Sequence, residues 1–211
     1  TAAMQFAARA YPSLVPSNGQ LVKSRIIGKD PDGSKTKTAE AVSIFMSYQI
    51  LNEMEGWEED MDKLLIMLPI VGTVFKKTYW DSAREVNCSK LVLPKNLIVD
   101  YWTKNLRDAE RITELIEINP RILAERVRSG MWIDPDLKEP TSSEASDRIK
   151  GPTPSKVDDT TPYLFAEQHT YLDLDDDGMK EPYVVTFHKV TGKVVRIVAR
   201  YDEEGMHFND D

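Results

Sequence analysis

The sequence predicts an α+β fold in which a helical hairpin packs on an antiparallel β-sheet and a three-stranded β-meander follows at the C-terminal end. Apolar residues recur at helical spacing over residues 39–68, and two regions beyond them are rich in β-branched and aromatic residues. A stretch rich in Pro, Ser and Asp separates those two regions. We therefore expect three parts: an α+β core over residues 1–133, a linker or long loop over residues 134–162, and the meander over residues 163–211.

The meander has the clearest pattern in the chain. Tyr and Phe are spread through the run Tyr163–Leu172, and Val, Ile and aromatic residues are frequent in the runs 183–190 and 193–201; turn residues separate the three. Thr191 and Gly192 indicate a two-residue loop between the last two strands. That loop predicts that Val190 faces Lys193, His188 faces Val195, Phe187 faces Arg196, Val185 faces Val198 and Tyr183 faces Arg200. Such a register places two Arg–aromatic pairs on one face of the sheet.

The core is expected to hold four helices. The first covers residues 1–10 and ends before Pro12, the second covers 39–54 after Thr38 as N-cap, the third covers 57–68, and the fourth covers 121–128. The second and third helices form the predicted hairpin. Its apolar contact is expected to bring Trp57, Leu64, Leu65 and Leu68 against Phe45 and Tyr48.

Several strands are also expected in the core. Residues 20–27 and 96–101 are extended candidates, and residues 73–80 and 90–93 can pair as a hairpin. Residues 110–118 alternate apolar and polar side chains and predict a strand, with a helix as the nearest alternative.

Composition excludes some classes of protein. The 211 residues carry a net charge of -8 and a pI near 5.0. A chain this acidic is a poor candidate for sequence-independent nucleic-acid binding, which needs clustered Lys and Arg. Cys88 is the only cysteine, which suits a reducing compartment, and no apolar run is long enough to span a membrane. The chain begins at Thr1 without Met, and we expect it to be a piece of a longer protein.

One acidic motif can bind a metal ion. Asp173, Asp175, Asp177 and Gly178 match the first half of an EF-hand calcium loop, and Glu181 falls at its ninth position. Val184 stands where the closing bidentate Glu belongs, so the match is incomplete. The candidate calcium ligands are therefore Asp173, Asp175, Asp177 and Glu181, and the alternative is a solvated acidic hairpin tip.

No catalytic constellation is recognisable. The chain has three histidines, His169, His188 and His207, and the predicted strands offer no carboxylate or Cys on the same face at ligand spacing. There is no phosphate-binding Gly-rich loop. We expect a structural or interaction role without catalytic residues and without a bound cofactor.

Six segments resemble one known family. They are residues 4–14 (MQFAARAYPSL), 64–79 (LLIMLPIVGTVFKKTY), 93–102 (LPKNLIVDYW), 108–112 (DAERI), 167–178 (EQHTYLDLDDDG) and 181–185 (EPYVV). These segments resemble the portal proteins of tailed double-stranded-DNA phages and prophages. The resemblance covers most of the chain outside its two polar loops.

The resemblance implies a ring, typically a dodecamer, at one vertex of the virion, assembled in the host cytoplasm and without a membrane. Double-stranded DNA would pass through the ring without sequence-specific binding, and terminase, scaffold, capsid and adaptor proteins would be partners. This chain would be mainly the peripheral wing, with β structure reaching toward the clip. We expect the piece alone to be monomeric or weakly associated, because its two amphipathic helices should bury each other's apolar faces.

Two other functions stay open. A calcium-stabilised β-rich interaction module would follow from the motif at residues 173–178, and calcium-dependent stability would support it. A non-catalytic part of a larger enzyme would follow if the active site lies outside these residues, and activity of the longer chain would support that reading.

Overall fold

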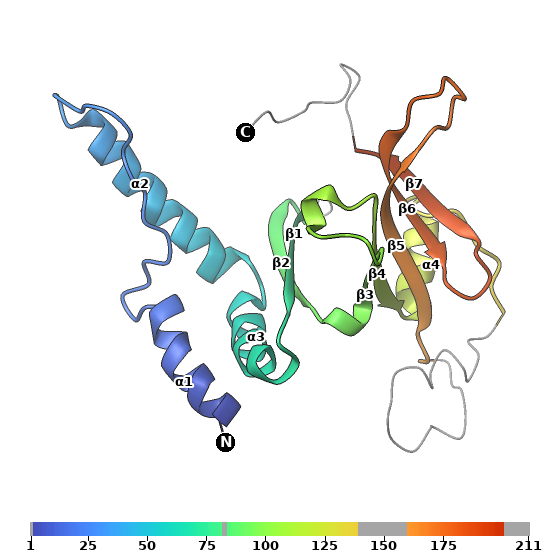
Figure 1. The fold of residues 1–211 in the computed structure, drawn as a ribbon, viewed down its shortest axis with the longest axis horizontal. Helices are drawn as coiled ribbons and strands as arrows, with labels where there is room; N and C mark the ends of the chain where they lie inside the picture. Colours follow the sequence, from blue (N-terminus) through green and yellow to red (C-terminus); the bar gives the residue numbers. More distant parts are fainter. Residues whose placement is uncertain (1, 82–83, 139–159, 201–211) are drawn as a thin grey trace. The chain divides into compact units, whose positions relative to one another are not determined.

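The computed structural model describes residues 2–81, 84–138 and 160–200 (Figure 1). The fold is α+β, as predicted: four α-helices accompany a two-stranded and a five-stranded antiparallel sheet within these ranges. The helices are Ala2–Leu14 (α1), Ser34–Tyr48 (α2), Trp57–Val71 (α3) and Pro120–Arg128 (α4). The strands are Phe75–Asp81 (β1), Val86–Val92 (β2), Leu97–Val99 (β3), Arg111–Ile118 (β4), Tyr163–Leu172 (β5), Glu181–His188 (β6) and Val194–Ala199 (β7).

The chain divides into two compact units, Thr1–Pro94 and Lys95–Asp211. This boundary differs from the expected division at residues 134–162. Strand order in the larger sheet is β3-β4-β5-β6-β7, so two strands that precede the predicted linker share a sheet with the meander. The physical reason is the β4–β5 ladder, which pairs Ile118 with Tyr163 across the intervening chain. Residues 139–159 of the linker lie outside the described residues.

Helix α3 is the centre of the first unit. Left-handed glycines stand at both of its ends, Gly56 before it and Gly72 after it, and the Gly72 amide donates to the Leu68 carbonyl at 2.8 Å. Buried Leu65 lies on this helix. Helix α3 packs on the β1–β2 hairpin, where Asp60 accepts a hydrogen bond from the Leu91 amide at 2.8 Å.

The helical partner of α3 is α1, and the predicted contact with α2 is wrong. Helix α1 packs against α3, and the Tyr11 hydroxyl donates to Glu58 at 3.1 Å. Helix α1 also runs four residues past its predicted end, with Pro12 inside its last turn. Phe45 and Tyr48 on α2, predicted to meet α3, are exposed.

Helix α2 packs instead against an extended segment that was predicted to be a strand. Residues 20–27 join no sheet. The amide of Val22 donates to Ser47 Oγ at 3.1 Å and that of Ser24 donates to Ser43 Oγ at 2.8 Å, so serine hydroxyls replace a strand ladder. Small polar side chains therefore form the buried face of this helix, and its apolar face is exposed. The expectation that no apolar stripe remains uncovered is wrong.

The predicted start of α2, at residue 39, is also wrong. The helix begins at Ser34, after left-handed Gly33, and Thr38 is not its N-cap. Asp30 serves the first turn instead: its carboxylate accepts hydrogen bonds from the Thr36 hydroxyl at 2.6 Å and from the amides of Thr36 and Lys35. The hydrogen bond from Thr36 lowers the pKa of Asp30. At its other end, α2 continues into a π-helical stretch, Gln49–Glu53.

The core of the second unit lies between α4 and one face of the five-stranded sheet. Ile118, Trp132, Tyr163, Phe165 and Val195 form it. The rings of Trp132 and Phe165 lie 5.0 Å apart, and the guanidinium of Arg126 lies 4.5 Å from the centre of the Trp132 ring. Among the described residues, no helix has the length and apolar character that a membrane span requires.

The β6–β7 register differs from the predicted one. Tyr183 pairs with Ala199 and Val185 with Ile197, and a bulge between Thr186 and Phe187 shifts the rest. A two-residue loop would need Thr191 in a left-handed conformation, which a β-branched residue disfavours. The chain turns over residues 189–192 instead, where Gly192 has φ 70° and donates its amide to the His188 carbonyl. The predicted pairs of Phe187 with Arg196 and Tyr183 with Arg200 are therefore not formed, and predicted strand end Tyr201 lies outside the described residues.

Lys76 carries an ammonium group that is buried and has no hydrogen-bond partner among the described residues. Its Nζ lies 4.5 Å from the centre of the Trp57 ring. Burial lowers the pKa of Lys76, which the nearby Asp60 carboxylate partly opposes. Because the pKa is lower in the folded state than in the unfolded state, stability rises with pH in the window below the ordinary value of 10.5.

We expect Lys76→Met to raise the free energy of unfolding at pH 7 by about 1 kcal/mol, because a poorly solvated charge is removed. The gain should shrink as the pH rises toward 10.5. Urea denaturation at pH 7 and pH 9.5 measures both effects. Lys63→Met, at an exposed position on α3, is the control and should change stability by less than about 0.5 kcal/mol. A loss of stability at pH 7 would show that the contact with Trp57 outweighs the cost of burial.

Candidate functional site

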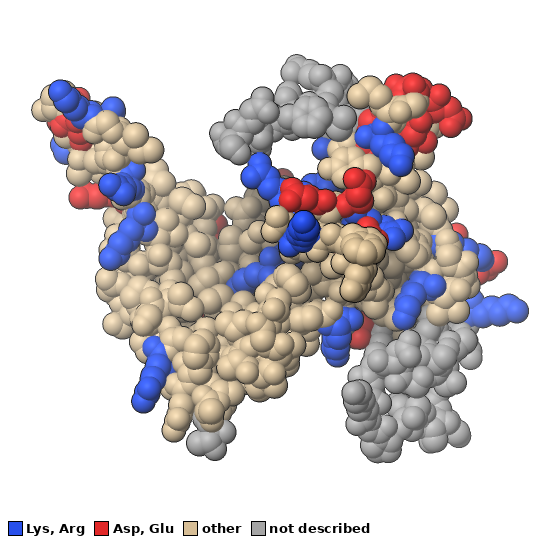
Figure 2. Space-filling model, in the orientation of Figure 1, with Lys and Arg blue, Asp and Glu red and all other residues tan. Residues whose placement is uncertain are grey.

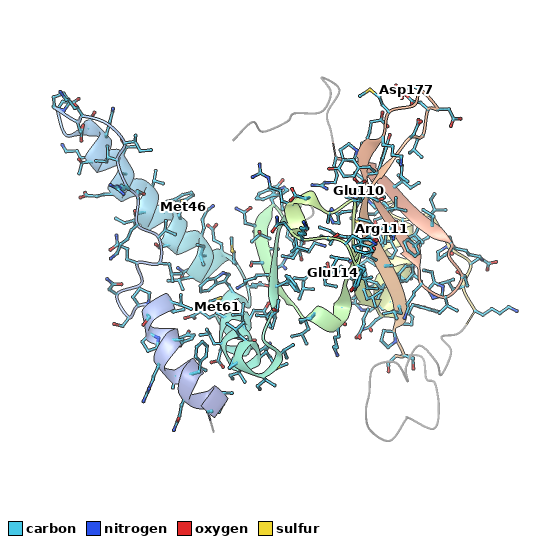
Figure 3. The ribbon with its side chains drawn as sticks, viewed as in Figure 1. Met46, Met61, Glu110, Arg111, Glu114 and Asp177 are labelled. Atoms are coloured by element: carbon cyan, nitrogen blue, oxygen red, sulfur yellow. The ribbon has the colours of Figure 1, made fainter. Side chains whose placement is uncertain are left out.

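The acidic motif forms the tip of the β5–β6 hairpin. Leu172 and Glu181 close the ladder as a cross-strand pair, and residues 173–180 form the loop that Asp177 marks in Figure 3. Asp176 and Gly178 take left-handed angles, with φ 60° and 91°. Asp173 accepts a hydrogen bond from the Gly178 amide at 2.9 Å, which folds the loop back over its own start.

Three carboxylates converge inside this loop. Each of Asp173, Asp175 and Asp177 offers an oxygen, and these oxygens all lie within 4.8 Å of one another. Asp173 Oδ1 is buried and has no hydrogen-bond partner among the described residues, whereas Asp175 and Asp177 are exposed. Clustered carboxylate oxygens suit a hard cation such as Ca²⁺. The loop therefore places together three of the four predicted ligands.

The fourth predicted ligand is not part of this group. Glu181 begins β6 opposite Leu172, and Val184, at the closing position of the motif, lies inside the same strand. Calcium takes six to eight oxygen ligands in typical sites. Water would have to supply much of the coordination, so the loop fits a weakly held cation better than a structural one.

We expect calcium to stabilise the protein little or not at all. A filled site at a hundredfold its dissociation constant would add about 2.7 kcal/mol to the free energy of unfolding. Thermal denaturation with and without millimolar Ca²⁺, with Mg²⁺ as the matched control, measures the effect. A large rise in melting temperature with Ca²⁺ that disappears in Asp175→Ala would contradict this expectation.

A second polar group lies on the sheet, on the face that carries Phe165. Cross-strand pairing sets Glu114 of β4 opposite Glu167 of β5, and Glu167 opposite buried Thr186 of β6. His169 Nε2 lies 3.6 Å from Glu167 Oε1. The inference that no carboxylate shares a face with His169 was wrong. The period of two in Glu167-Gln168-His169 is the signal that could have found the pair.

These side chains do not form a metal centre of the kind found in the acidic loop. Within the described ranges, Glu114, Glu167 and His169 are not a group whose ligand atoms all lie within 4.8 Å. Figure 3 labels Glu114 on β4, Arg111 at the start of that strand and Glu110 just before it.

The remaining candidates have structural surroundings. His188 Nδ1 lies 3.0 Å from Thr191 Oγ1, and its ring packs 5.3 Å from that of Phe165, as cross-strand packing predicts. Cys88 is half-buried on β2. His207 lies outside the described residues.

A comparison with models of known protein families finds no match for this sequence, and a search of curated proteins finds none. The likeness to portal proteins therefore depends on the six quoted segments alone, and the functions below are proposals.

Proposed function

We propose that this chain is a structural part of one subunit of a phage portal, the ring through which DNA is packaged and ejected. The observation that carries the proposal is where the family-like segments lie. They cover most of α1, the second half of α3 with most of β1, the whole of β3, the start of β4, and parts of β5 and β6 with most of the loop between them. These elements come from both compact units, so the resembling segments are distributed over the whole described chain.

Exposed aromatic residues support a subunit of an assembly. Tyr101 and Trp102 follow β3 in one of the family-like segments, and they are 90% and 86% exposed. Their rings meet edge to face with centres 5.2 Å apart. Aromatic side chains are enriched in protein interfaces, and leaving two of them in water is unfavourable for an isolated protein. A partner that covers them is the simplest physical explanation.

The distribution of charge along the chain supports a role in a conduit that does not bind DNA. Residues 1–94 contain 11 basic and 11 acidic side chains, whereas residues 95–211 contain 16 basic and 24 acidic ones, so the second unit carries the whole net charge of -8. Acidic side chains gather over the β5–β6 loop (Figure 2). An acidic chain repels phosphate, which agrees with a subunit that does not bind DNA.

The proposal assigns the partners that the family implies. The chain would assemble as a ring, most often of twelve subunits, at the portal vertex of the virion. Terminase, scaffold and capsid proteins, and later adaptor proteins, would contact it, and DNA would pass without sequence-specific binding.

Electron microscopy of the full-length protein tests the proposal. The expected result is a closed ring with a central channel. A full-length protein that stays monomeric under all assembly conditions, or that forms only closed dimers, would refute it.

A second candidate function is a calcium-dependent interaction module. Asp173 Oδ1, buried and without a hydrogen-bond partner in the described part of the chain, favours it, because an incoming cation would satisfy that oxygen. Under this alternative, assembly would require Ca²⁺ and would fail in Asp173→Ala. Under the portal proposal, assembly proceeds when a chelator has removed Ca²⁺ from the solution.

A further inference from the structure

The contact between α3 and the β1–β2 hairpin contains two buried polar atoms, Lys76 Nζ and Ser89 Oγ. They are two of the three buried side-chain polar atoms that lack a hydrogen-bond partner within the described residues. Strand pairing sets Lys76 opposite Leu91 and Ser89 opposite Thr78, so Lys76 and Ser89 lie on one face of the hairpin. Because the Lys76 ammonium lies over the ring of Trp57, the first residue of α3, this face is turned toward the helix.

Few apolar contacts hold the hairpin on α3. Val92 is the one buried hydrophobic side chain among the described residues of the hairpin. Helix α3 packs more extensively against α1 than against the hairpin, which it meets mainly through β2 (Figure 1). The hydrogen bond from the Leu91 amide to Asp60 crosses the contact, and the exposed ion pair of Arg84 with Glu55 adds little to it. Regions with few buried apolar contacts open at a low free-energy cost.

Opening of this contact would return both polar atoms to water. A buried hydroxyl without a hydrogen bond is less stable than a hydrated one, and the penalty is larger for an ammonium group. The Trp57 ring offsets part of the penalty, and the Asp60 carboxylate attracts the ammonium of Lys76. The pKa of Lys76 is nevertheless lowered, because the cost of burial exceeds this attraction. The closed contact is therefore weakened by the side chains inside it.

The backbone at the start of the hairpin can act as a hinge. Gly72, between α3 and β1, has φ 85°, and no other group lies within 4 Å of the position that a side chain would occupy there. At the other end, Pro94 follows β2 and is the last residue of the first compact unit. Hinges are a few residues at the ends of elements that absorb a change in backbone angles.

We propose that the β1–β2 hairpin detaches from α3 as one piece while α1 and α3 stay packed, and that buried Lys76 and Ser89 set how often it does so. An isolated two-stranded hairpin is only marginally stable in water, so its amides exchange quickly once it has left the helix. This opening is a property of the Thr1–Pro94 unit and does not depend on the portal function.

Amide hydrogen exchange of the intact protein at pH 7, followed by mass spectrometry, tests the proposal. The expected result is that amides in Phe75–Asp81 and Val86–Val92 are at least tenfold less protected than amides in the middle of α3. The Leu91 amide reports on the contact directly, because its acceptor is Asp60 on α3.

Substitutions separate the buried groups from the rest of the contact. Lys76→Met should slow exchange in the hairpin about fivefold, and Ser89→Ala about twofold, with α3 unchanged. Asp60→Asn removes the attraction to Lys76 and should speed exchange in the hairpin. Lys63→Met on α3 and Asn87→Ala on β2 are the matched controls at exposed positions, and neither should change it.

Three outcomes would overturn the proposal. Equal protection of the hairpin and α3 in the wild-type protein would mean that they open together. Unchanged exchange in Lys76→Met would mean that the buried ammonium does not control the opening. Slowing of the hairpin and α3 by the same factor would assign the exchange to unfolding of the whole unit.

Discussion

Replacing Phe165 with alanine should lower the free energy of unfolding of the Lys95–Asp211 unit by about 3–5 kcal/mol. Phe165 is fully buried, with an exposed fraction of 0%, and its ring lies against those of Trp132 and His188. Truncation removes this apolar contact and leaves a cavity that the sheet and α4 cannot readily close. Urea denaturation followed by tryptophan fluorescence measures the loss, because Trp132 reports directly on the cavity.

Tyr171→Ala is the control for this measurement. Tyr171 lies on the same strand but is 43% exposed, so its loss should cost much less. Equal effects of the two substitutions would mean that the centre of the core lies elsewhere on the sheet.

Leu65→Ala should destabilise the Thr1–Pro94 unit by about 2–5 kcal/mol. Leu65 is buried on α3, the helix that packs against both α1 and the β1–β2 hairpin. The cavity would therefore loosen both of these contacts. Differential scanning calorimetry would show the change as a lower melting temperature.

Ile70→Ala on the same helix is the matched control, because Ile70 is exposed and its side chain contributes little burial. A near-neutral Leu65→Ala would contradict the packing described for α3, since a buried leucine cannot be truncated without loss.

Local pattern was sufficient to predict most of the strands. Strand β5 matches its expected bounds, because aromatic residues are spread along it and turn residues follow it. Strand β4 was also expected, and its alternation of apolar and polar residues decided against a helix. Both signals come from side chains within the element itself.

Contacts between distant segments were not predictable in the same way. The apolar face of α2 indicated a helix, as found, but did not show what the helix would pack against. The serine hydroxyls that hold residues 20–27 give no hydrophobic signal. Asp30 caps the first turn of α2 from outside the helix, whereas the sequence pattern predicts a cap directly beside the first helical residue, such as Thr38.

The candidate site was predicted in part. Asp173, Asp175 and Asp177 come together as the motif implies, because one short loop holds all three. Glu181 does not join them, because the strand that begins there fixes its direction. Glu114 and Glu167 were missed, since their pairing depends on a register between strands far apart in the sequence.

The β4–β5 ladder has a consequence for how the second unit folds. The β3–β4, β5–β6 and β6–β7 ladders each join strands that are close in the sequence. Strands β4 and β5 also pair, but residues 119–162 separate them in the sequence. Contacts of high sequence separation slow folding, so we expect two quickly formed hairpin-like pieces that join in a later, rate-limiting step. Loop-closure entropy grows only slowly with length, by about 0.6 kcal/mol for each doubling. Evolution could therefore lengthen the connection between β4 and β5 with small effects on stability.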